Sequence, residues 1–279
     1  MRFPCRLATG QRLHASLFLG TGSRSPGARY PNGPIVTASA QYLFGKIEYW
    51  QDGMGARDQR TRPQALYIWR LKHSRLRAEF HDRVANSIAK EFRAGWLVDV
   101  GCGPGLLAIK LLPLAPELRV VGVDIDMMML SEARVSGCPY LVRASADSLP
   151  FRSNAIGLVV STTSLKDWTN RAQGLAEIGR IVRPGGTGIV YDFITAGPES
   201  NPPHVIRRFG VVSEFLRRAT QWMQPFSLQD ARNLAETVHH PPIMAEVDVE
   251  RDLAIVRIRI RKIRDGGLAA GDLKLEPSD

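Results

Sequence analysis

The stretch Val98-Asp99-Val100-Gly101-Cys102-Gly103-Pro104-Gly105 decides the fold. Apolar residues from Trp96 to Val100 predict a buried strand, and a helix is expected from Leu106 to Leu112, so the chain must turn sharply between them. Glycine permits positive φ and lets a ligand approach the backbone where a Cβ atom would collide. Because such loops also occur as simple turns, their surroundings must decide their role.

Downstream of this loop, short apolar runs alternate with helical periodicity. Strands are expected at 119–123, 140–144, 156–161 and 188–193, and helices at 127–135 and 171–182. The segments 243–249 and 253–261 alternate apolar and polar residues, which predicts an antiparallel hairpin with one solvated face. We therefore expect a doubly wound α/β fold with a mostly parallel, Rossmann-like sheet of about seven strands that ends in an antiparallel edge hairpin.

Asp124 gives the glycine loop its chemical context. It ends the next strand, 19 residues after Gly105, where a carboxylate can accept hydrogen bonds from both hydroxyls of a bound ribose. Its alternative role, a helix N-cap, is available to Asp126. A dinucleotide fingerprint would place its third glycine where Leu106 stands, so the GxGxG spacing favours S-adenosylmethionine over NAD.

The positive charge lies ahead of this region. The formal net charge is +10, and residues 1–93 hold 16 Lys and Arg against 6 Asp and Glu, so the rest of the chain is balanced. A basic arm fits this distribution better than a uniformly basic nucleic-acid surface. Residues 1–47 contain no acidic residue and are compatible with a disordered arm, an organelle presequence or an extension upstream of a start at Met54.

The chain is expected to divide into three parts. Residues 1–63 form a basic, flexible arm, 64–264 form the folded domain with a substrate-side insertion at 196–241, and 265–279 form a loose tail. No apolar run is long enough to span a membrane. Cys5, Cys102 and Cys138 lack disulfide or metal-ligand spacing, which favours a reducing compartment and a cytoplasmic location.

A helix is also expected ahead of the glycine loop. Leu76, Phe80, Val84, Ile88 and Phe92 recur every four residues and form an apolar stripe. The intervening charged residues, Arg77 among them, are expected to face water. A preceding helix with Tyr67 and Trp69 either packs on the core or covers a site, and both interpretations stay open.

Four motifs in this order resemble those of class I S-adenosylmethionine-dependent methyltransferases, in particular the small-molecule group that includes ubiquinone/menaquinone-biosynthesis C-methyltransferases. The resemblance covers about 76–262. Its motifs are Val98–Gly105, Val121–Asp126, Ala146–Phe151 and Glu177–Gly186, the last ending in a Pro-Gly-Gly turn.

The resemblance implies S-adenosylmethionine as cofactor and S-adenosylhomocysteine as product. The glycines would lie beside the amino-acid part of the cofactor, Asp99 would steady the loop or meet the ammonium, and Ile125 would lie on the adenine. Ser145 or Asp147 would contact adenine N6. The complete expected cofactor site is Asp99, Gly101, Cys102, Gly103, Gly105, Asp124, Ile125, Ser145, Ala146, Asp147 and Ser161.

Lys166 and Asp167 are the candidate catalytic residues, because they stand where relatives carry adjacent histidines. They would orient the acceptor or take its proton; the alternative is an exposed ion pair of little energetic value. The segment 196–226 is read as either an apolar pocket wall or core packing, and Asn201-Pro202-Pro203-His204 as a loop and helix start.

The expected function is methyl transfer to O, C or N of a small hydrophobic or aromatic metabolite, with no metal. Two alternatives stay open: an RNA or protein methyltransferase that uses the basic arm, and a non-catalytic subunit that binds the cofactor. The expected partner is the small-molecule acceptor, with a homodimer left open and nucleic acid disfavoured.

Overall fold

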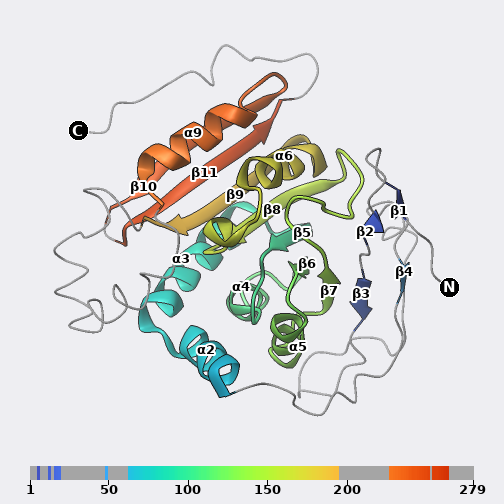
Figure 1. Ribbon diagram of the computed structural model, residues 1–279, viewed down its shortest axis with the longest axis vertical. Coiled ribbons are helices and arrows are strands. Elements are labelled where there is room, and N and C mark those ends of the chain that lie inside the picture. Colours follow the sequence, from blue (N-terminus) through green and yellow to red (C-terminus); the bar gives the residue numbers. More distant parts are fainter. Residues whose placement is uncertain are drawn as a thin grey trace.

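Figure 1 shows the computed structural model of the chain. The structure describes residues 62–194, 226–251 and 253–263, together with four short strands in the first fifty residues. The tail 265–279, the first part of the expected insertion (196–225) and most of the arm lie outside the described residues. Among the described helices, none is long and apolar enough to cross a membrane.

A twisted sheet forms the centre of the molecule (Figure 1). Its strand order is β10-β11-β9-β8-β5-β6-β7-β3-β4. The bounds are β5 Ala94–Val100, β6 Glu117–Asp124, β7 Tyr140–Arg143, β8 Ile156–Thr162, β9 Val182–Phe193, β10 Ile243–Glu250 and β11 Ile255–Lys262. Strands β5 to β9 are parallel, and β11 runs antiparallel to both β9 and β10. The predicted α/β sheet with an antiparallel edge hairpin is confirmed.

The basic arm contributes strands that the sequence did not indicate. β3 (Ser16–Leu19) pairs antiparallel with β7, and β4 (Glu48–Tyr49) pairs parallel with β3, so the sheet extends beyond its seven expected strands. β1 (Cys5–Arg6) and β2 (Arg12–Leu13) pair with each other.

Helices cover both faces of the sheet and divide the core in two. α3 (Arg75–Glu91), α4 (Leu106–Leu111) and α5 (Met127–Val135) pack on one face, where Phe80, Val84 and Ile88 of the predicted stripe are buried. α6 (Arg171–Ile181) and α9 (Leu228–Val238) pack on the other. α2 (Arg62–His73) precedes α3 and buries Ile68, whereas Trp69 is 56% exposed.

Local polar contacts set where the helices begin. The Ser74 hydroxyl accepts from Arg77 N at the start of α3, and the Asn170 side chain accepts from Gln173 N at the start of α6. Ser227 and Asp230 form a reciprocal capping box at the start of α9. These contacts satisfy N–H groups that have no partner within the helix.

The hairpin shows why its sequence alternates. Ile258 and Ile260 on β11 are fully buried against α6 and α9, whereas Arg257 on the opposite face forms an ion pair of 2.8 Å with Asp248 on β10. The charged face therefore carries a cross-strand ion pair, and of the two hairpin strands β10 lies at the edge of the sheet because β11 pairs with β9.

Candidate functional site

A cavity of about 320 Å³ opens at the carboxyl ends of β5, β6 and β8. The glycine loop and the tip of β6 border one side, and residues of α2 and α3 border the other. In an open parallel sheet, ligands bind outside the carboxyl ends of the strands. The cavity therefore lies where the sequence predicts a cofactor.

The glycine loop has a backbone that side chains would disturb. Gly101, Gly103 and Gly105 have φ of 71°, 53° and 80°, all in the left-handed region. A Cβ atom on Gly101 would collide with Ser164 Oγ, whereas a Cβ on Gly103 would meet nothing within 4 Å. Since Gly103 lines the cavity, the open space above it leaves room for a ligand to approach the backbone.

Asp124 joins this loop to the tip of the next strand. Its Oδ2 accepts from Gly103 N at 2.9 Å, and its Oδ1 accepts from Asp126 N at 2.9 Å. The Asp126 side chain accepts from Met128 N and caps α5, as expected. Asp124 also lines the cavity, and a carboxylate has lone pairs for more hydrogen bonds than these two, which suits the hydroxyls of a ribose.

The structure brings most of the expected cofactor residues together. Those that line the cavity are Gly101, Cys102, Gly103, Asp124, Ile125, Ser145 and Ala146. Ile125 is 61% exposed and offers an apolar face at the rim. Asp99, Gly105, Asp147 and Ser161 are not among the lining residues, and their expected contacts stay predictions.

Two of these four residues, Ser161 and Gly105, contribute to the packing of the glycine loop without lining the cavity. Ser161 is buried and shares a hydrogen bond of 2.8 Å with Ser164, whose hydroxyl also donates to Val100 O at 3.2 Å. Gly105 precedes α4, and a Cβ there would lie 3.2 Å from the backbone of Ala133 on α5. Both residues therefore contribute to packing of the loop.

Asp99 is buried without a partner. Its side chain is 1% exposed, and neither carboxylate oxygen has a hydrogen-bond partner among the described residues. Burial, with a smaller contribution from the charge of Asp124, raises the pKa of Asp99 to about 7. A carboxyl group in this position is largely neutral below neutral pH.

α6 holds the loop that carries Ser145 and Ala146. Glu177 accepts from Leu149 N at 2.8 Å, and Arg180 donates to Leu149 O at 2.9 Å and to Phe151 O at 2.8 Å. Glu177 and Arg180 also pair with each other at 2.6 Å. The motif Glu177–Gly186 therefore has a structural role, because its side chains hold the motif Ala146–Phe151 in place.

Lys166 and Asp167 lie in different surroundings. Lys166 is 4% exposed, does not line the cavity, and forms a buried ion pair of 2.9 Å with Asp192 on β9. Asp167 lines the cavity, and partial burial raises its pKa while the charge of Lys166 opposes the shift. The alternative of one exposed ion pair between these neighbours is not what the structure shows.

Lys166 instead ties two strand ends together. Its Nζ donates to Thr163 O at 3.2 Å, and its backbone N donates to the second oxygen of Asp192 at 3.0 Å. Thr163 has φ of 57°, which is uncommon for a β-branched residue. The ion pair thus holds a strained residue at the cavity wall.

Arg77 was expected to face water, and that prediction is wrong. Its side chain lines the cavity, donates to Thr163 Oγ1 at 2.7 Å and lies 5.9 Å from the centre of the Phe193 ring. Burial lowers the pKa of the guanidinium. The apolar stripe offered one signal, since Arg77 adjoins Leu76 and Phe80 at the edge of the buried face.

His81, one turn after Arg77, also lines the cavity. Its Nδ1 lies 2.6 Å from Arg77 O. Because a carbonyl can only accept, Nδ1 carries the proton and Nε2 is the acceptor nitrogen. Burial lowers the pKa of His81 to about 4, so the ring is neutral at physiological pH.

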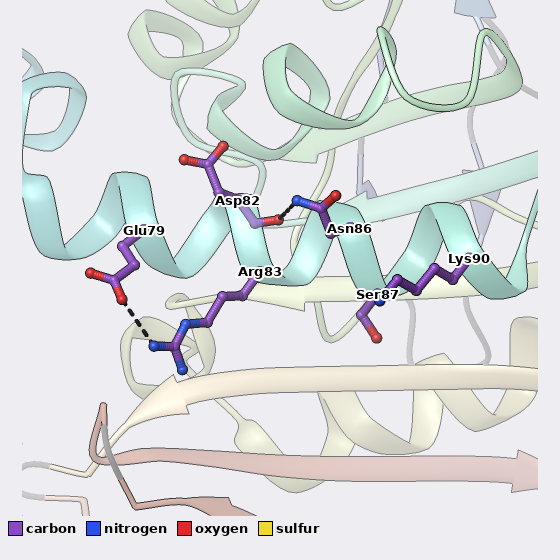
Figure 2. A pocket seen from close by; sticks show the side chains of 6 residues that line it. All are labelled: Glu79, Asp82, Arg83, Asn86, Ser87 and Lys90. Atoms are coloured by element: carbon purple, nitrogen blue, oxygen red, sulfur yellow. Dashed lines mark hydrogen bonds and ion pairs between the residues drawn. The ribbon is translucent and has the colours of Figure 1, made fainter.

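A second hollow, of about 570 Å³, lies along the opposite side of α3 (Figure 2). Glu79 and Arg83 form an ion pair of 2.9 Å there, and Asn86 donates to Asp82 O. None of the four motifs contributes to its lining. Elsewhere in the described chain, no group of three His, Cys, Asp or Glu side chains is placed to hold a metal ion.

The exchange Asp99→Asn tests the burial of this carboxyl group. The folded pKa is raised, so the wild-type protein loses stability as pH rises from about 4 to about 7. The neutral amide has no such dependence. We expect the variant to gain roughly 2–4 kcal/mol over wild type at pH 8 and to match it near pH 4, measured by urea unfolding. A difference that does not change with pH would contradict the raised pKa.

The exchange Lys166→Met tests the buried ion pair. It leaves Asp192 charged, buried and unpaired, so the free energy of unfolding should fall by about 3–5 kcal/mol. The double variant Lys166→Met/Asp192→Asn should recover at least half of this loss, because it removes the unpaired buried charge and its amide oxygen can still accept from one of the two backbone N–H groups that donate to Asp192. A loss below about 1 kcal/mol in the single variant would mean that water reaches the pair.

Comparisons with known proteins agree with this geometry. Residues 98–190 match a family model described as a methyltransferase domain. An uncharacterised chloroplastic methyltransferase of Arabidopsis thaliana is 31% identical over 46% of this chain and 38% of its own length. A ubiquinone/menaquinone biosynthesis C-methyltransferase of Geobacter sulfurreducens is 30% identical over 36% of this chain and 43% of its own. The chain thus spans about four tenths of these relatives.

The solved structures show the same fold. A crystal structure of a protein from Methanococcus maripaludis, named a putative S-adenosyl-L-methionine-dependent methyltransferase, superposes with a TM-score of 0.54 at 21% identity and covers 76% of this chain and 98% of the other. The sequence motifs, the order of the strands and the segment that matches the family model all indicate the same kind of domain. Residues 98–190 therefore match a methyltransferase domain, and the chain has the fold of class I S-adenosylmethionine-dependent methyltransferases.

Proposed function

We propose that the protein transfers a methyl group from S-adenosylmethionine to O, C or N of a small hydrophobic or aromatic metabolite. The observation that carries this proposal is that Asp124 and the glycine loop face one cavity. S-adenosylmethionine contains a ribose and a sulfonium, so its site needs a side chain that binds the ribose hydroxyls and a loop backbone that the cofactor can approach closely.

The residues present fit the cofactor. Asp124 would accept from the ribose hydroxyls, Ile125 would lie on the adenine, and the open space above Gly103 would take the amino-acid part. The sulfonium supplies an activated methyl group, which an aligned nucleophile displaces in line. The protein must then position the acceptor and exclude water.

The acceptor would lie toward β8 and β9. Thr163 and Asp167, both in the segment after β8, line that side of the cavity, and His81 faces it from α3. Asp167 would accept a proton or orient a hydroxyl of the acceptor. Lys166, which does not reach the cavity lining, would act through Thr163 as a positioning residue.

The relatives support an aromatic acceptor. Among them are the Geobacter protein, named a ubiquinone/menaquinone biosynthesis C-methyltransferase, and a protein of Symbiobacterium thermophilum, named a demethylmenaquinone methyltransferase, which is 28% identical over 58% of this chain and 62% of its own length. A quinol ring becomes more nucleophilic at carbon when a hydroxyl loses its proton, and Asp167 in the cavity would accept that proton. The cytoplasmic location and a homodimer remain predictions.

The exchange Asp124→Ala tests the cofactor site. It removes charge-assisted hydrogen bonds to the ribose, so S-adenosylhomocysteine should bind at least tenfold more weakly in calorimetry. Glu117→Gln changes an exposed carboxylate at the other end of β6 and should leave the affinity within twofold.

Unchanged affinity in Asp124→Ala would refute the ribose assignment. A rise in melting temperature with NAD, and none with S-adenosylhomocysteine, would refute the proposed cofactor. Tight cofactor binding without turnover of quinols, catechols and phenols would favour a non-catalytic subunit.

A further inference from the structure

The guanidinium of Arg77 lines the cavity, and most of its hydrogen-bonding capacity is unused within the residues that the structure describes. A guanidinium has five N–H donors, and among these residues the side chain of Arg77 makes one hydrogen bond, to Thr163 Oγ1. Within the described part of the chain, no carboxylate lies within ion-pair distance of it. The centre of the Phe193 ring lies 5.9 Å from the guanidinium carbon, within the range of a cation–π contact.

Arg77 is held in one orientation. Its partner Thr163 is fixed three times: the hydroxyl by Arg77, the carbonyl oxygen by Lys166 Nζ, and the N–H by Tyr191 O at 2.7 Å. Phe193 ends β9, the strand that contains Tyr191, and its ring packs against Phe80, which lies one turn after Arg77 on α3. A group that is fixed in this way before a ligand arrives loses little freedom on binding.

The charges around the cavity make Arg77 distinctive. Three carboxylates line it, those of Asp124, Asp126 and Asp167, and among the described lining residues Arg77 is the one Lys or Arg. His81 is neutral. An anionic ligand that enters the cavity would therefore be attracted to Arg77 and repelled elsewhere.

The position of Arg77 indicates which ligand it serves. In the sheet, β6 lies next to β5, then come β8 and β9. Asp124 ends β6 and the glycine loop follows β5, whereas Arg77 contacts Thr163 after β8 and Phe193 at the end of β9. The ribose and the guanidinium thus belong to opposite sides of the cavity, with the glycine loop between them.

We propose that Arg77 is a specificity-determining residue that binds an anionic oxygen of the methyl acceptor, a carboxylate or phenolate conjugated with the ring to be methylated. The planar fork of donors matches such a group in two-point contact. This inference rests on the proposed function and narrows its acceptor to a planar aromatic anion.

Benzoate is a suitable probe because benzamide is its neutral isostere. With the full chain saturated in S-adenosylhomocysteine, calorimetry should show benzoate binding at least tenfold more tightly than benzamide. Arg77→Gln should abolish this preference while its affinity for S-adenosylhomocysteine stays within twofold of wild type. Arg75→Gln, on the exposed side of the same helix, should leave both properties unchanged.

The other source of a carboxylate is the cofactor itself. Methylthioadenosine lacks the amino-acid part, so it separates the two cases. If Arg77→Gln weakens S-adenosylhomocysteine at least tenfold and leaves methylthioadenosine unaffected, Arg77 holds the cofactor and the acceptor assignment is overturned.

Absence of a benzoate preference in wild type with S-adenosylhomocysteine bound would also overturn the assignment. Failure of wild type to bind S-adenosylhomocysteine would instead overturn the proposed function. If Arg77→Gln does not fold, Arg77→Lys keeps the charge without the fork and should lose benzoate affinity at least threefold with cofactor affinity retained; full retention of benzoate affinity there would contradict two-point binding.

Discussion

The hydrogen bond from Gly103 N to Asp124 Oδ2 is the contact on which the site depends. It joins the loop after β5 to the tip of β6 and orients the carboxylate at the same time. The loop accepts this arrangement because three of its residues are glycines in the left-handed region. Two further hydrogen bonds, from Gly101 N and Cys102 N to Val123 O, fix the start of the turn. A ligand therefore meets a surface that is already formed.

Much of the fold was predictable because it follows from local pattern. Buried parallel strands read as continuous apolar runs, and the hairpin alternates because one face of β11 packs on helices while the other carries charge. The division of labour between Asp124 and Asp126 was also predictable, since a cap must stand at the first turn of α5. By contrast, β3 and β4 lie in a segment without period, and they pair with β7, from which β3 is separated by more than a hundred residues.

The half of the site that the sequence missed depends on contacts between distant residues. Lys166 was expected either to act on the acceptor or to form an exposed ion pair with Asp167, yet its partner Asp192 lies 26 positions away on β9. Arg77 looked like part of a solvated helix face, yet it reaches Thr163, 86 positions away. Periodicity assigns a residue to a face of a helix, but a residue at the edge of the buried stripe can extend a long side chain toward the core or toward water. Arg77 is such a residue, and its side chain lines the cavity.

The two sides of the cavity differ in how their polar groups are stabilised. On the side proposed for the ribose, Asp124 accepts hydrogen bonds from backbone N–H groups, which need no partner side chain. On the other side, Thr163 is strained and Lys166 and Asp192 are buried as a pair. Arg77 lies partly buried there, with the charges of Asp192 and Asp167 nearby but with no ion-pair contact among the described residues. Strain and buried charge cost stability, and they persist where the surrounding structure enforces them. The arrangement around Asp124 therefore follows from the fold, whereas the arrangement around Arg77 depends on side chains from α3, β9 and the segment after β8, and we expect the choice of acceptor to be encoded there.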